Sequence, residues 1–230
     1  MIPETKSEKE KYAAATKAVS LVENNMIVGL GSGSTVYYFL KLLGEEVRQG
    51  LQIKGIPTSG RSETIAREAG IEITHLAEHP DIDITIDGAD EFDPKLNLIK
   101  GGGGALLREK IVASNSKKMV VIADSAKQVD QLGNFPLPIE VIPFSQYPIF
   151  KKLEKEGMNP VIRKFENGMP YVTDEGNHII DCHTGLVKDP SELAAWLDGI
   201  PGVVCQGFFI NLATMVIMGV GEKAVVIPKA

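Results

Sequence analysis

A carboxylate and an ammonium group flank the most unusual segment of the chain, KGGGGALLREK at positions 100–110. Lys100 precedes the glycines, and Glu109 follows them early in a helical pattern. A carboxylate can remove a proton from carbon, while a cation and backbone N–H groups hold the negative charge that builds on oxygen. We therefore predict that Glu109 is a general base and that Lys100 helps to hold an oxyanion. The competing interpretation of Glu109 is a helix-surface glutamate paired with a nearby Lys or Arg.

The glycine run itself, Gly101–Gly104, predicts contact between the backbone and a ligand. Four consecutive glycines lose more conformational entropy on ordering than any other run, a cost that makes little sense in a loop that serves stability alone. A flexible linker is the alternative, but the strongly helical ALLREKIVA that follows argues against it.

Two carboxylates, Asp87 and Asp90, lie in the segment DGADEFD that ends an apolar strand pattern. The residues between them, Gly88 and Ala89, are small and let a ligand approach closely. Two carboxylates in one tight loop can bind sugar hydroxyls, shuttle protons to ring oxygens or chelate a metal. Turns also favour aspartate for local reasons; the position after a strand favours the functional interpretation.

A possible phosphate cradle lies in GLGSGSTV, positions 29–36, where a strand pattern joins a helical one. Unpaired N–H groups and the positive dipole end of a helix suit phosphate, and Ser32, Gly33, Ser34 and Thr35 would supply the donors. The segment lacks the third glycine of a dinucleotide fingerprint and the GK[ST] of a P-loop. A glycine turn needed only for packing is the alternative. A second hydroxyl-rich loop, TSGRSETIA at 58–66, either caps a helix or contributes to the same site.

Lys127, in ADSAKQVD after the next apolar run, is a further candidate for the same pocket, although an isolated lysine is more often solvated. The histidines and cysteines show no metal-ligand spacing, so we expect no metal site. The two cysteines, Cys182 and Cys205, are interpreted as small buried apolar residues in a reducing compartment.

Strands that alternate with helices position these loops. Ser7 and Glu10 suggest a capping box that opens an amphipathic helix. Apolar strand patterns then alternate with helical ones as far as residue 123, which predicts a parallel sheet with right-handed crossovers. Ligands on such sheets bind beyond the carboxyl ends of the strands, where all the unusual segments fall. The strand patterns are MIVGL, IKGIP, DITID and MVVIA, and the helical ones are STVYYFLKLLGEEV, SGRSETIAREAG and ALLREKIVAS.

The regular alternation of strand and helix patterns ends after position 133, which predicts a second domain. Five prolines occur from Pro136 to Pro160, and YVTDEGNHIID has the signal of a hairpin whose turn contains Asp174 and Gly176. A helix is expected at about 191–197. We predict a small α+β domain at 134–206 and a main domain of 1–133 with 207–230, the tail 211–228 returning to the main sheet as strand.

Composition limits the classes of partner. The chain has 230 residues, 43% hydrophobic and 23% charged, which is typical of globular proteins. Its net charge of -6 comes without a long basic block, so we expect no nucleic-acid partner. No segment has the length and apolar character of a membrane span, and the start MIPETKSEKEK lacks the pattern of a signal peptide. We expect a cytoplasmic protein.

In their order, these segments resemble ribose-5-phosphate isomerase type A, essentially from end to end. The most specific are DGADE and KGGGGALLREK, and the others are GLGSGST, the TS loop, IADSAKQVD, FPLPIEVIP, VTDEGN and IPGVV. The resemblance implies a Rossmann-like parallel sheet flanked by helices, with a smaller α+β, ferredoxin-like domain. It also implies a metal-independent isomerase without a cofactor that acts on a sugar phosphate in the pentose phosphate pathway, as a homodimer or homotetramer.

The resemblance also implies roles for individual residues. Glu109 would carry a proton between C1 and C2 of the open-chain sugar through an enediolate, and Asp87 and Asp90 would bind hydroxyls and assist ring opening. Lys100 and the glycines would stabilise the oxyanion. The implied substrate-binding residues are Ser32, Gly33, Ser34, Thr35, Asp87, Gly88, Ala89, Asp90, Lys100, Gly101, Gly102, Gly103 and Lys127. Two positions depart from the family pattern: Ser32 stands where Thr is common and Gly104 where Ala is common.

Two other functions fit parts of the pattern. A transferase related to acyl-CoA transferases would use Glu109 as a covalent nucleophile and would leave a trappable thioester on it after incubation with acyl-CoA. A sugar-phosphate sensor without catalysis, as in effector domains of transcription regulators, would not need Glu109 beside Lys100. Only about 25 residues precede the first strand, too few for a DNA-reading helix-turn-helix.

Overall fold

The computed structural model describes residues 3–229, which form two compact units. Among the described residues, unit 1 comprises 3–89, 108–128 and 211–229, and unit 2 comprises 90–107 and 129–210. The predicted domain boundaries at 133/134 and 206/207 stay a prediction. In the structure, contacts group the segment 90–107, which carries the glycine run, with the smaller unit.

Unit 1 is built on a mostly parallel sheet. Within residues 3–229 seven strands form it in the order β14-β13-β7-β4-β1-β2-β3, and only the pairing of β13 with β14 is antiparallel. The predicted return of the tail to this sheet is therefore confirmed. The strands are β1 (Ile27–Leu30), β2 (Lys54–Pro57), β3 (Glu72–Ile73), β4 (Ile84–Asp87), β7 (Met119–Asp124), β13 (Met215–Val220) and β14 (Lys223–Pro228).

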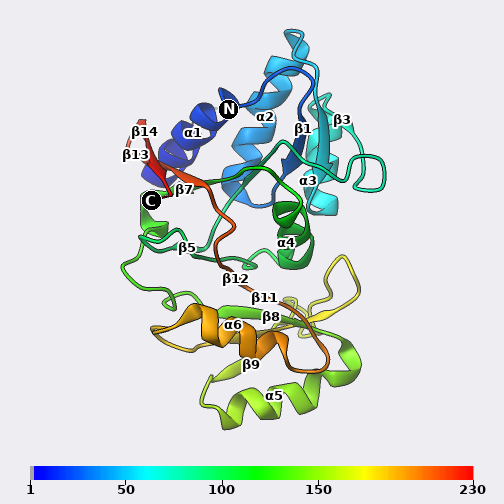
Figure 1. Ribbon diagram of the computed structural model, residues 1–230, viewed down its shortest axis with the longest axis vertical. Helices are drawn as coiled ribbons and strands as arrows, with labels where there is room; N and C mark the ends of the chain where they lie inside the picture. The colour runs from blue at the N-terminus through cyan, green and yellow to red at the C-terminus, as the bar shows by residue number, and fades with distance from the viewer. Residues whose placement is uncertain (1–2, 230) are drawn as a thin grey trace. The chain divides into compact units, whose positions relative to one another are not determined.

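Helices cover both faces of this sheet, which confirms the predicted α/β class. The helices are α1 (Lys6–Val19), α2 (Ser34–Arg48), α3 (Gly60–Glu68) and α4 (Leu106–Ser114). Helices α1 and α2 pack side by side (Figure 1) and share one apolar cluster with α3 and the sheet. Val112 of α4 belongs to a different cluster, with Ile56 and Ile82. The chain moves from β1 to β2 in one direction along the sheet and from β4 to β7 in the other. Because both crossovers are right-handed, their helices lie on opposite faces of the sheet.

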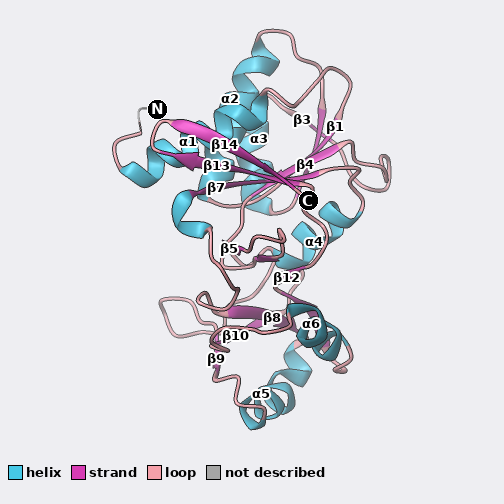
Figure 2. Cartoon of the chain, turned by 60° about the vertical axis from the view of Figure 1, so that its left-hand side comes forward, coloured by secondary structure: helices cyan, strands magenta, loops and turns pink. Residues whose placement is uncertain are grey.

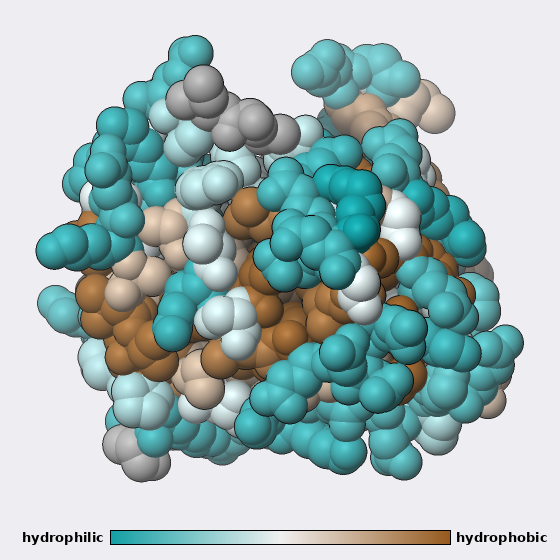
Figure 3. All heavy atoms as spheres, turned by 90° about the horizontal axis from the view of Figure 1, so that it is seen from above, coloured by the Kyte–Doolittle hydropathy of each residue, from teal (hydrophilic) through white to brown (hydrophobic). Residues whose placement is uncertain are grey.

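The core of unit 1 is made by the apolar stripes of its helices. Val36, Phe39, Leu40 and Leu43 recur at helical spacing along α2 and are at most 1% exposed. On the face of the molecule in Figure 3, hydrophobic side chains form a central band bordered by hydrophilic ones. Within the part of the chain that the structure describes, no helix is long and apolar enough to cross a membrane.

Unit 2 contains an antiparallel sheet with the order β11-β8-β10-β9. Along the chain the elements are β8 (Leu137–Val141), α5 (Gln146–Lys155), β9 (Pro160–Ile162), β10 (His178–Cys182), α6 (Pro190–Asp198) and β11 (Val203–Gln206), after the short helix η2 (Pro143–Ser145). This βαββαβ connectivity is that of ferredoxin-like folds. Side chains of α5, α6 and β8 share one cluster, so both helices pack on the same face of the sheet (Figure 2).

The predicted hairpin of unit 2 is present. Thr173 and Asn177 are joined by a backbone hydrogen bond, and Val172 forms a bridge with His178. Glu140 of β8 holds the turn, because its Oε1 accepts from Thr173 Oγ1 and Asn177 Nδ2, each at 2.9 Å.

A small antiparallel sheet completes unit 2. Its order is β12-β6-β5, with β5 at Glu91–Phe92, β6 at Leu98–Ile99 and β12 at Phe208–Phe209. Strands β5 and β6 lie between the aspartate loop and the glycine run in the chain, and the register pairs Ile99 with both Glu91 and Phe208. This sheet therefore sets the place where the glycine run begins.

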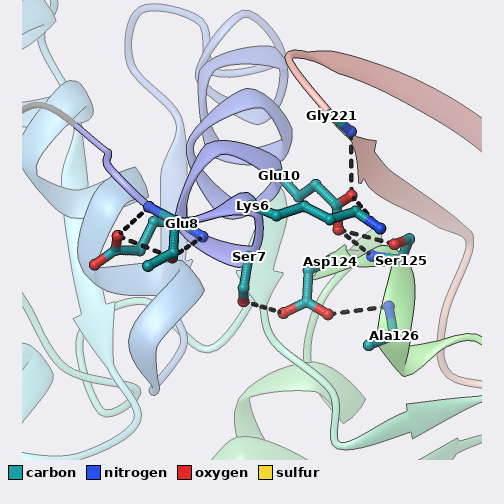
Figure 4. A network of polar contacts seen from close by, with 9 residues as sticks. Lys6, Ser7, Glu8, Glu10, Asp124, Ser125, Ala126 and Gly221 are labelled. Atoms are coloured by element: carbon teal, nitrogen blue, oxygen red, sulfur yellow. Dashed lines mark hydrogen bonds and ion pairs between the residues drawn. The ribbon is translucent and has the colours of Figure 1, made fainter.

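The predicted capping box of Ser7 and Glu10 is wrong, because the helix begins two residues earlier. Thr5 is the N-cap of α1 and Glu8 is its partner at N3. Ser7 instead donates to Asp124 Oδ2 at the end of β7. Glu10 is 2% exposed and accepts from the N–H and Oγ of Ser125 and from the N–H of Gly221 (Figure 4).

The carboxylates of Glu10 and Asp124 fix the loop after β7. Asp124 caps the short helix η1 (Ser125–Lys127) by accepting from the N–H of Ala126. Lys127, the candidate substrate contact, is the last residue of that helix. Glu10 therefore ties helix α1 to the segment that carries Lys127 (Figure 4).

We expect Glu10→Gln to lower the free energy of unfolding by roughly 1–3 kcal/mol at about pH 7. The amide NH₂ group of glutamine would take the place of one carboxylate oxygen, so a hydrogen bond that this oxygen accepts would be lost. Burial raises the pKa of Glu10, but hydrogen bonds from Gly221 and Ser125 outweigh it and lower the pKa below its usual 4.5. The carboxylate therefore stabilises the fold above pH 4.5, and this contribution disappears as the pH falls through the lower folded value.

Urea unfolding of both proteins at about pH 7 and at about pH 3 checks this prediction. The difference between wild type and Glu10→Gln should shrink in acid. An equal difference at both pH values would contradict it.

Candidate active site

One group of candidate residues lies where the strand order of unit 1 reverses. The chain runs outward from β1 to β2 and β3 and then returns to place β4 on the other side of β1. In open α/β sheets, ligands bind at this switch point beyond the carboxyl ends of the strands. The segment that follows β1 starts at Gly31, and β4 ends at Asp87. The predicted phosphate loop and the first aspartate are therefore neighbours.

Asp87 fixes the phosphate loop directly. It is completely buried, and its Oδ1 accepts from the N–H groups of Ser32 at 3.0 Å and Gly88 at 2.7 Å. A Cβ on Gly31 would lie 2.2 Å from that same oxygen, so only glycine allows the loop to come this close. The two N–H donors hold this carboxyl group in one orientation.

The N-terminus of helix α2 supplies the donors of the loop. Gly33 precedes the helix with φ of 111°, a left-handed conformation that favours glycine, and no side chain within residues 3–229 caps the helix by a hydrogen bond. Ser34 and Thr35 begin the helix, and their N–H groups precede the first hydrogen bond of the helix, from Tyr37 to Gly33. An anion would satisfy them.

Ser32 is bound to other residues of unit 1, and its role as a phosphate ligand stays a prediction. Its N–H is occupied by Asp87, and its Oγ contacts the hydroxyls of Thr58, Ser59 and Ser62 at 2.7–3.1 Å. Ser62 Oγ also donates to the carbonyl of Gly31 at 2.6 Å. The second hydroxyl-rich loop therefore holds the phosphate loop in place through these hydrogen bonds.

A second group of candidate residues lies in unit 2 and starts with Asp90. Its N–H donates to the carbonyl of Ile99 at 2.9 Å, and its Oδ2 accepts from the N–H of Gly102 at 2.8 Å. A Cβ on Gly102 would lie 2.7 Å from Asp90 Oδ1 and 2.8 Å from Phe135 Cζ. The structure therefore brings the second aspartate and the glycine run together.

Lys100 is buried, with 2% of its surface exposed, directly after β6. Its N–H donates to the carbonyl of Gly207 at 2.9 Å, and its Nζ lies 5.4 Å from the centroid of the Phe209 ring. A desolvated cation over an aromatic face is stabilised by the negative face of the ring. A Cβ on Gly207 would lie 2.6 Å from the carbonyl oxygen of Lys100, so that position needs glycine.

Glu109 lies in the first turn of α4 and belongs to unit 1. It is 5% exposed, so the alternative of a helix-surface glutamate does not apply. The N-terminal turn of a helix favours a negatively charged carboxylate. A buried carboxylate thus follows the glycine run by five residues of chain.

The described residues contain no group of three or more His, Cys, Asp and Glu side chains that could hold a metal ion. Cys182 and Cys205 are both buried free thiols. Burial raises the pKa of Cys182 to about 12, so its thiol stays protonated at neutral pH. Neither cysteine has the environment of a nucleophile.

The predicted site residues thus fall into two groups by unit. Unit 1 holds Ser32, Gly33, Ser34, Thr35, Asp87, Gly88, Ala89, Glu109 and Lys127, and unit 2 holds Asp90, Lys100, Gly101, Gly102 and Gly103. Other residues that contact this machinery were not found from the sequence. Phe209 and Gly207 contact Lys100, and Arg163 and Tyr171 bind the glycine run. The sequence offers no local signal for them, because each contact joins segments that are far apart in the chain.

Comparisons with known proteins identify the family of this chain. A family model described as ribose 5-phosphate isomerase A (phosphoriboisomerase A) matches residues 54–223. The chain is 53% identical over 226 residues to a ribose-5-phosphate isomerase A of Ruegeria sp. (strain TM1040), which covers 95% of this chain and 86% of the relative. The corresponding protein of Methanothermobacter thermautotrophicus is 49% identical over 214 residues, 92% of this chain and 94% of the relative.

Solved structures give the same picture. A D-ribose-5-phosphate isomerase in complex with phospho-erythronic acid superposes with a TM-score of 0.94 at 40% identity, covering 97% of this chain and 100% of the other. The ribose 5-phosphate isomerase A of Methanocaldococcus jannaschii has a TM-score of 0.91 at 39% identity, covering 95% and 98%. The predicted combination of a Rossmann-like sheet and a small α+β unit is therefore confirmed.

Gly102→Ala should destabilise the protein by about 1–3 kcal/mol, because the new methyl group would meet Asp90 and the Phe135 ring. Gly103→Ala is the matched control, since a Cβ at that position has no atom within 4 Å. Thermal unfolding of the two variants without ligand compares them. Equal unfolding temperatures would mean that the glycine run is not packed as described.

Proposed function

This chain belongs to the ribose 5-phosphate isomerase A family and is an aldose–ketose isomerase of ribose 5-phosphate, and we propose that Glu109 is the base that carries the proton between C1 and C2. The observation that carries this proposal is the burial of Glu109, 5% exposed, in the helical turn that follows a glycine run rich in N–H donors. A base in that place has its proton acceptor next to the groups that stabilise an oxyanion.

The proposed reaction starts from the open-chain aldose. Glu109 takes the proton from C2, the electrons of the C–H bond form a C1–C2 double bond, and negative charge builds on O1 of the resulting enediolate. The same carboxyl group then returns the proton to C1. The proton of the C2 hydroxyl moves to O1, and the product is ribulose 5-phosphate. The base ends in its starting state, and no electron is gained or lost overall.

Lys100 and the glycine run would stabilise the enediolate oxygen. Lys100 is 2% exposed, and a buried cation acts more strongly on a developing charge than a solvated one. The N–H of Gly103 meets no acceptor among residues 3–229, and the residue is exposed, so this donor remains available to a ligand. Such donors cost no reorganisation when charge develops.

The remaining roles follow from the two aspartates and the loop at α2. Asp87 and Asp90 would bind hydroxyls of the sugar and assist ring opening. Ser34 and Thr35, at the N-terminus of helix α2, would bind the phosphate. Lys127 would contact the substrate from the helix η1 that Asp124 caps.

Covalent geometry supports the use of both aspartates on one small substrate. Asp87 accepts from the phosphate loop and Asp90 accepts from the glycine run. These aspartates are three residues apart, and three residues of chain span at most about 11 Å. One pentose phosphate is of that size.

We propose further that the protein works in the cytoplasm, without a metal or another cofactor, as a homodimer or homotetramer. The two buried free thiols support a reducing compartment. Light scattering coupled to gel filtration measures the assembly, and activity in EDTA tests for a metal.

Glu109→Gln should lower turnover by at least ~10²-fold, because the amide cannot accept the proton. Affinity for phospho-erythronic acid should change only a few-fold, since binding groups stay in place. The assay follows formation of ketose from ribose 5-phosphate in deuterated water, with detection of carbon-bound deuterium.

Glu63→Gln is the matched control, because Glu63 also lies in the first turn of a helix, α3, outside the site. Its turnover should equal that of wild type. Near-normal turnover of Glu109→Gln would remove Glu109 from the mechanism.

A further inference from the structure

A single arginine of unit 2 holds two carbonyl groups of the glycine run. Arg163 Nη1 donates to the carbonyl oxygens of Gly101 at 2.8 Å and Gly102 at 3.1 Å. Its Nε donates to Asp181 Oδ2 at 2.8 Å, and its Nη2 binds the other carboxylate oxygen. Only 15% of the Arg163 side chain and 19% of the Asp181 side chain are exposed. The guanidinium group is therefore fixed on one side by a carboxylate and presents its other side to the run.

The backbone of this arginine directly follows strand β9 and is hydrogen-bonded to two neighbouring segments. Its N–H donates to the carbonyl of Ile179 and its carbonyl accepts from the N–H of Tyr171, each at 2.9 Å. Asp181 lies in the middle of the paired segment of β10, opposite Val161 of β9. Both charged side chains therefore rise from a rigid surface, which is what precise placement of a neighbouring loop requires.

Tyr171 holds the next carbonyl of the run. Its Oη donates to the carbonyl of Gly103 at 3.3 Å, and its ring centroid lies 5.8 Å from Arg163 Cζ. Burial raises the pKa of Tyr171, so the phenol keeps the proton that it donates. Gly104 has φ of 84°, and a Cβ there would lie 2.3 Å from Tyr171 Oη, so glycine at 104 makes room for this contact.

Fixing these carbonyls decides where the N–H groups point. In a trans peptide the C=O and the N–H lie on opposite sides of the bond. The Gly102 carbonyl faces Arg163, so the N–H of Gly103 is turned away from Arg163. The N–H of Gly102 is taken by Asp90, and that of Gly104 by the carbonyl of Gly101. Of these three donors, the one at Gly103 is left for a ligand.

We propose that Arg163, oriented by Asp181, is a positioning residue for the isomerisation: it holds the glycine run so that the Gly103 N–H faces the enediolate oxygen. This inference rests on the proposed function of the glycine run. Arginine is required because its planar fork can bind a carboxylate and two carbonyls at once, whereas an ammonium group cannot reproduce that geometry. Tyr171 supports the same orientation from the following residue.

The test compares Arg163→Ala with Arg67→Ala. Arg67 also binds a carboxylate, that of Glu63, through Nε and Nη2, but on helix α3. Steady-state kinetics give kcat and KM for each variant. Hydrogen exchange of the amides in 100–107 without substrate gives the order of the glycine run, and guanidinium ion added at millimolar concentration tests for rescue. Arg163→Lys and Asp181→Asn are measured in the same way, and they decide the matter if Arg163→Ala does not fold.

We expect Arg163→Ala to lower kcat by ~10–100-fold with little change in KM, because a misplaced donor affects the transition state more than the bound substrate. Amides of the glycine run should exchange faster, and guanidinium should restore part of kcat. Asp181→Asn and Arg163→Lys should show smaller losses of the same kind, and Arg67→Ala none.

Normal kcat in folded Arg163 and Asp181 variants would overturn the proposal, and so would a loss of kcat with unchanged exchange of the run. Failure of the proposed function gives a different result. In that case Glu109→Gln retains turnover, while faster exchange in Arg163→Ala still shows whether the arginine orders the loop.

Discussion

The whole site depends on carboxylates that accept hydrogen bonds from backbone N–H groups of the two ligand loops. Asp87 accepts from Ser32 and Gly88, and Asp90 accepts from Gly102. Each bond is charge-assisted and therefore stronger than a bond between neutral groups, and the two bonds to Asp87 are also partly buried. Because Asp87 is the last residue of β4, the order of the parallel strands determines where the phosphate loop is anchored.

The glycine run shows why several anchors are needed. Ordering four glycines costs roughly 4–8 kcal/mol of backbone entropy. The run is held by three hydrogen bonds to charged groups, one from Gly102 to Asp90 and two from Arg163 to carbonyls. At about 1.5–3 kcal/mol each, they offset roughly 4.5–9 kcal/mol. Glycine is used because side chains at 102 and 104 would meet Asp90 and Tyr171. The run is thus rigid where it is anchored and leaves a donor at Gly103.

Local patterns in the sequence predicted the elements, but they did not predict the contacts that orient the site. Alternating strand and helix patterns, the hairpin at Asp174 and Gly176 and the returning tail were all found, because each depends on neighbouring residues. The capping box was placed at Ser7 instead of Thr5, since both positions have a hydroxyl followed three residues later by glutamate. The support from Arg163 and Phe209 was missed, because sheet register alone brings those side chains to the glycine run and to Lys100.

A crystal structure of the protein with phospho-erythronic acid tests the central claim most directly. The ligand has a phosphate at one end and a carboxylate at the other, and the carboxylate resembles the two oxygens of an enediolate. We expect the phosphate on the N–H groups of Ser34 and Thr35, and the carboxylate within hydrogen-bond distance of Lys100 and the Gly103 N–H, with Glu109 against C1 or C2. A ligand bound without contact to Glu109, or with its carboxylate away from Lys100, would contradict the account.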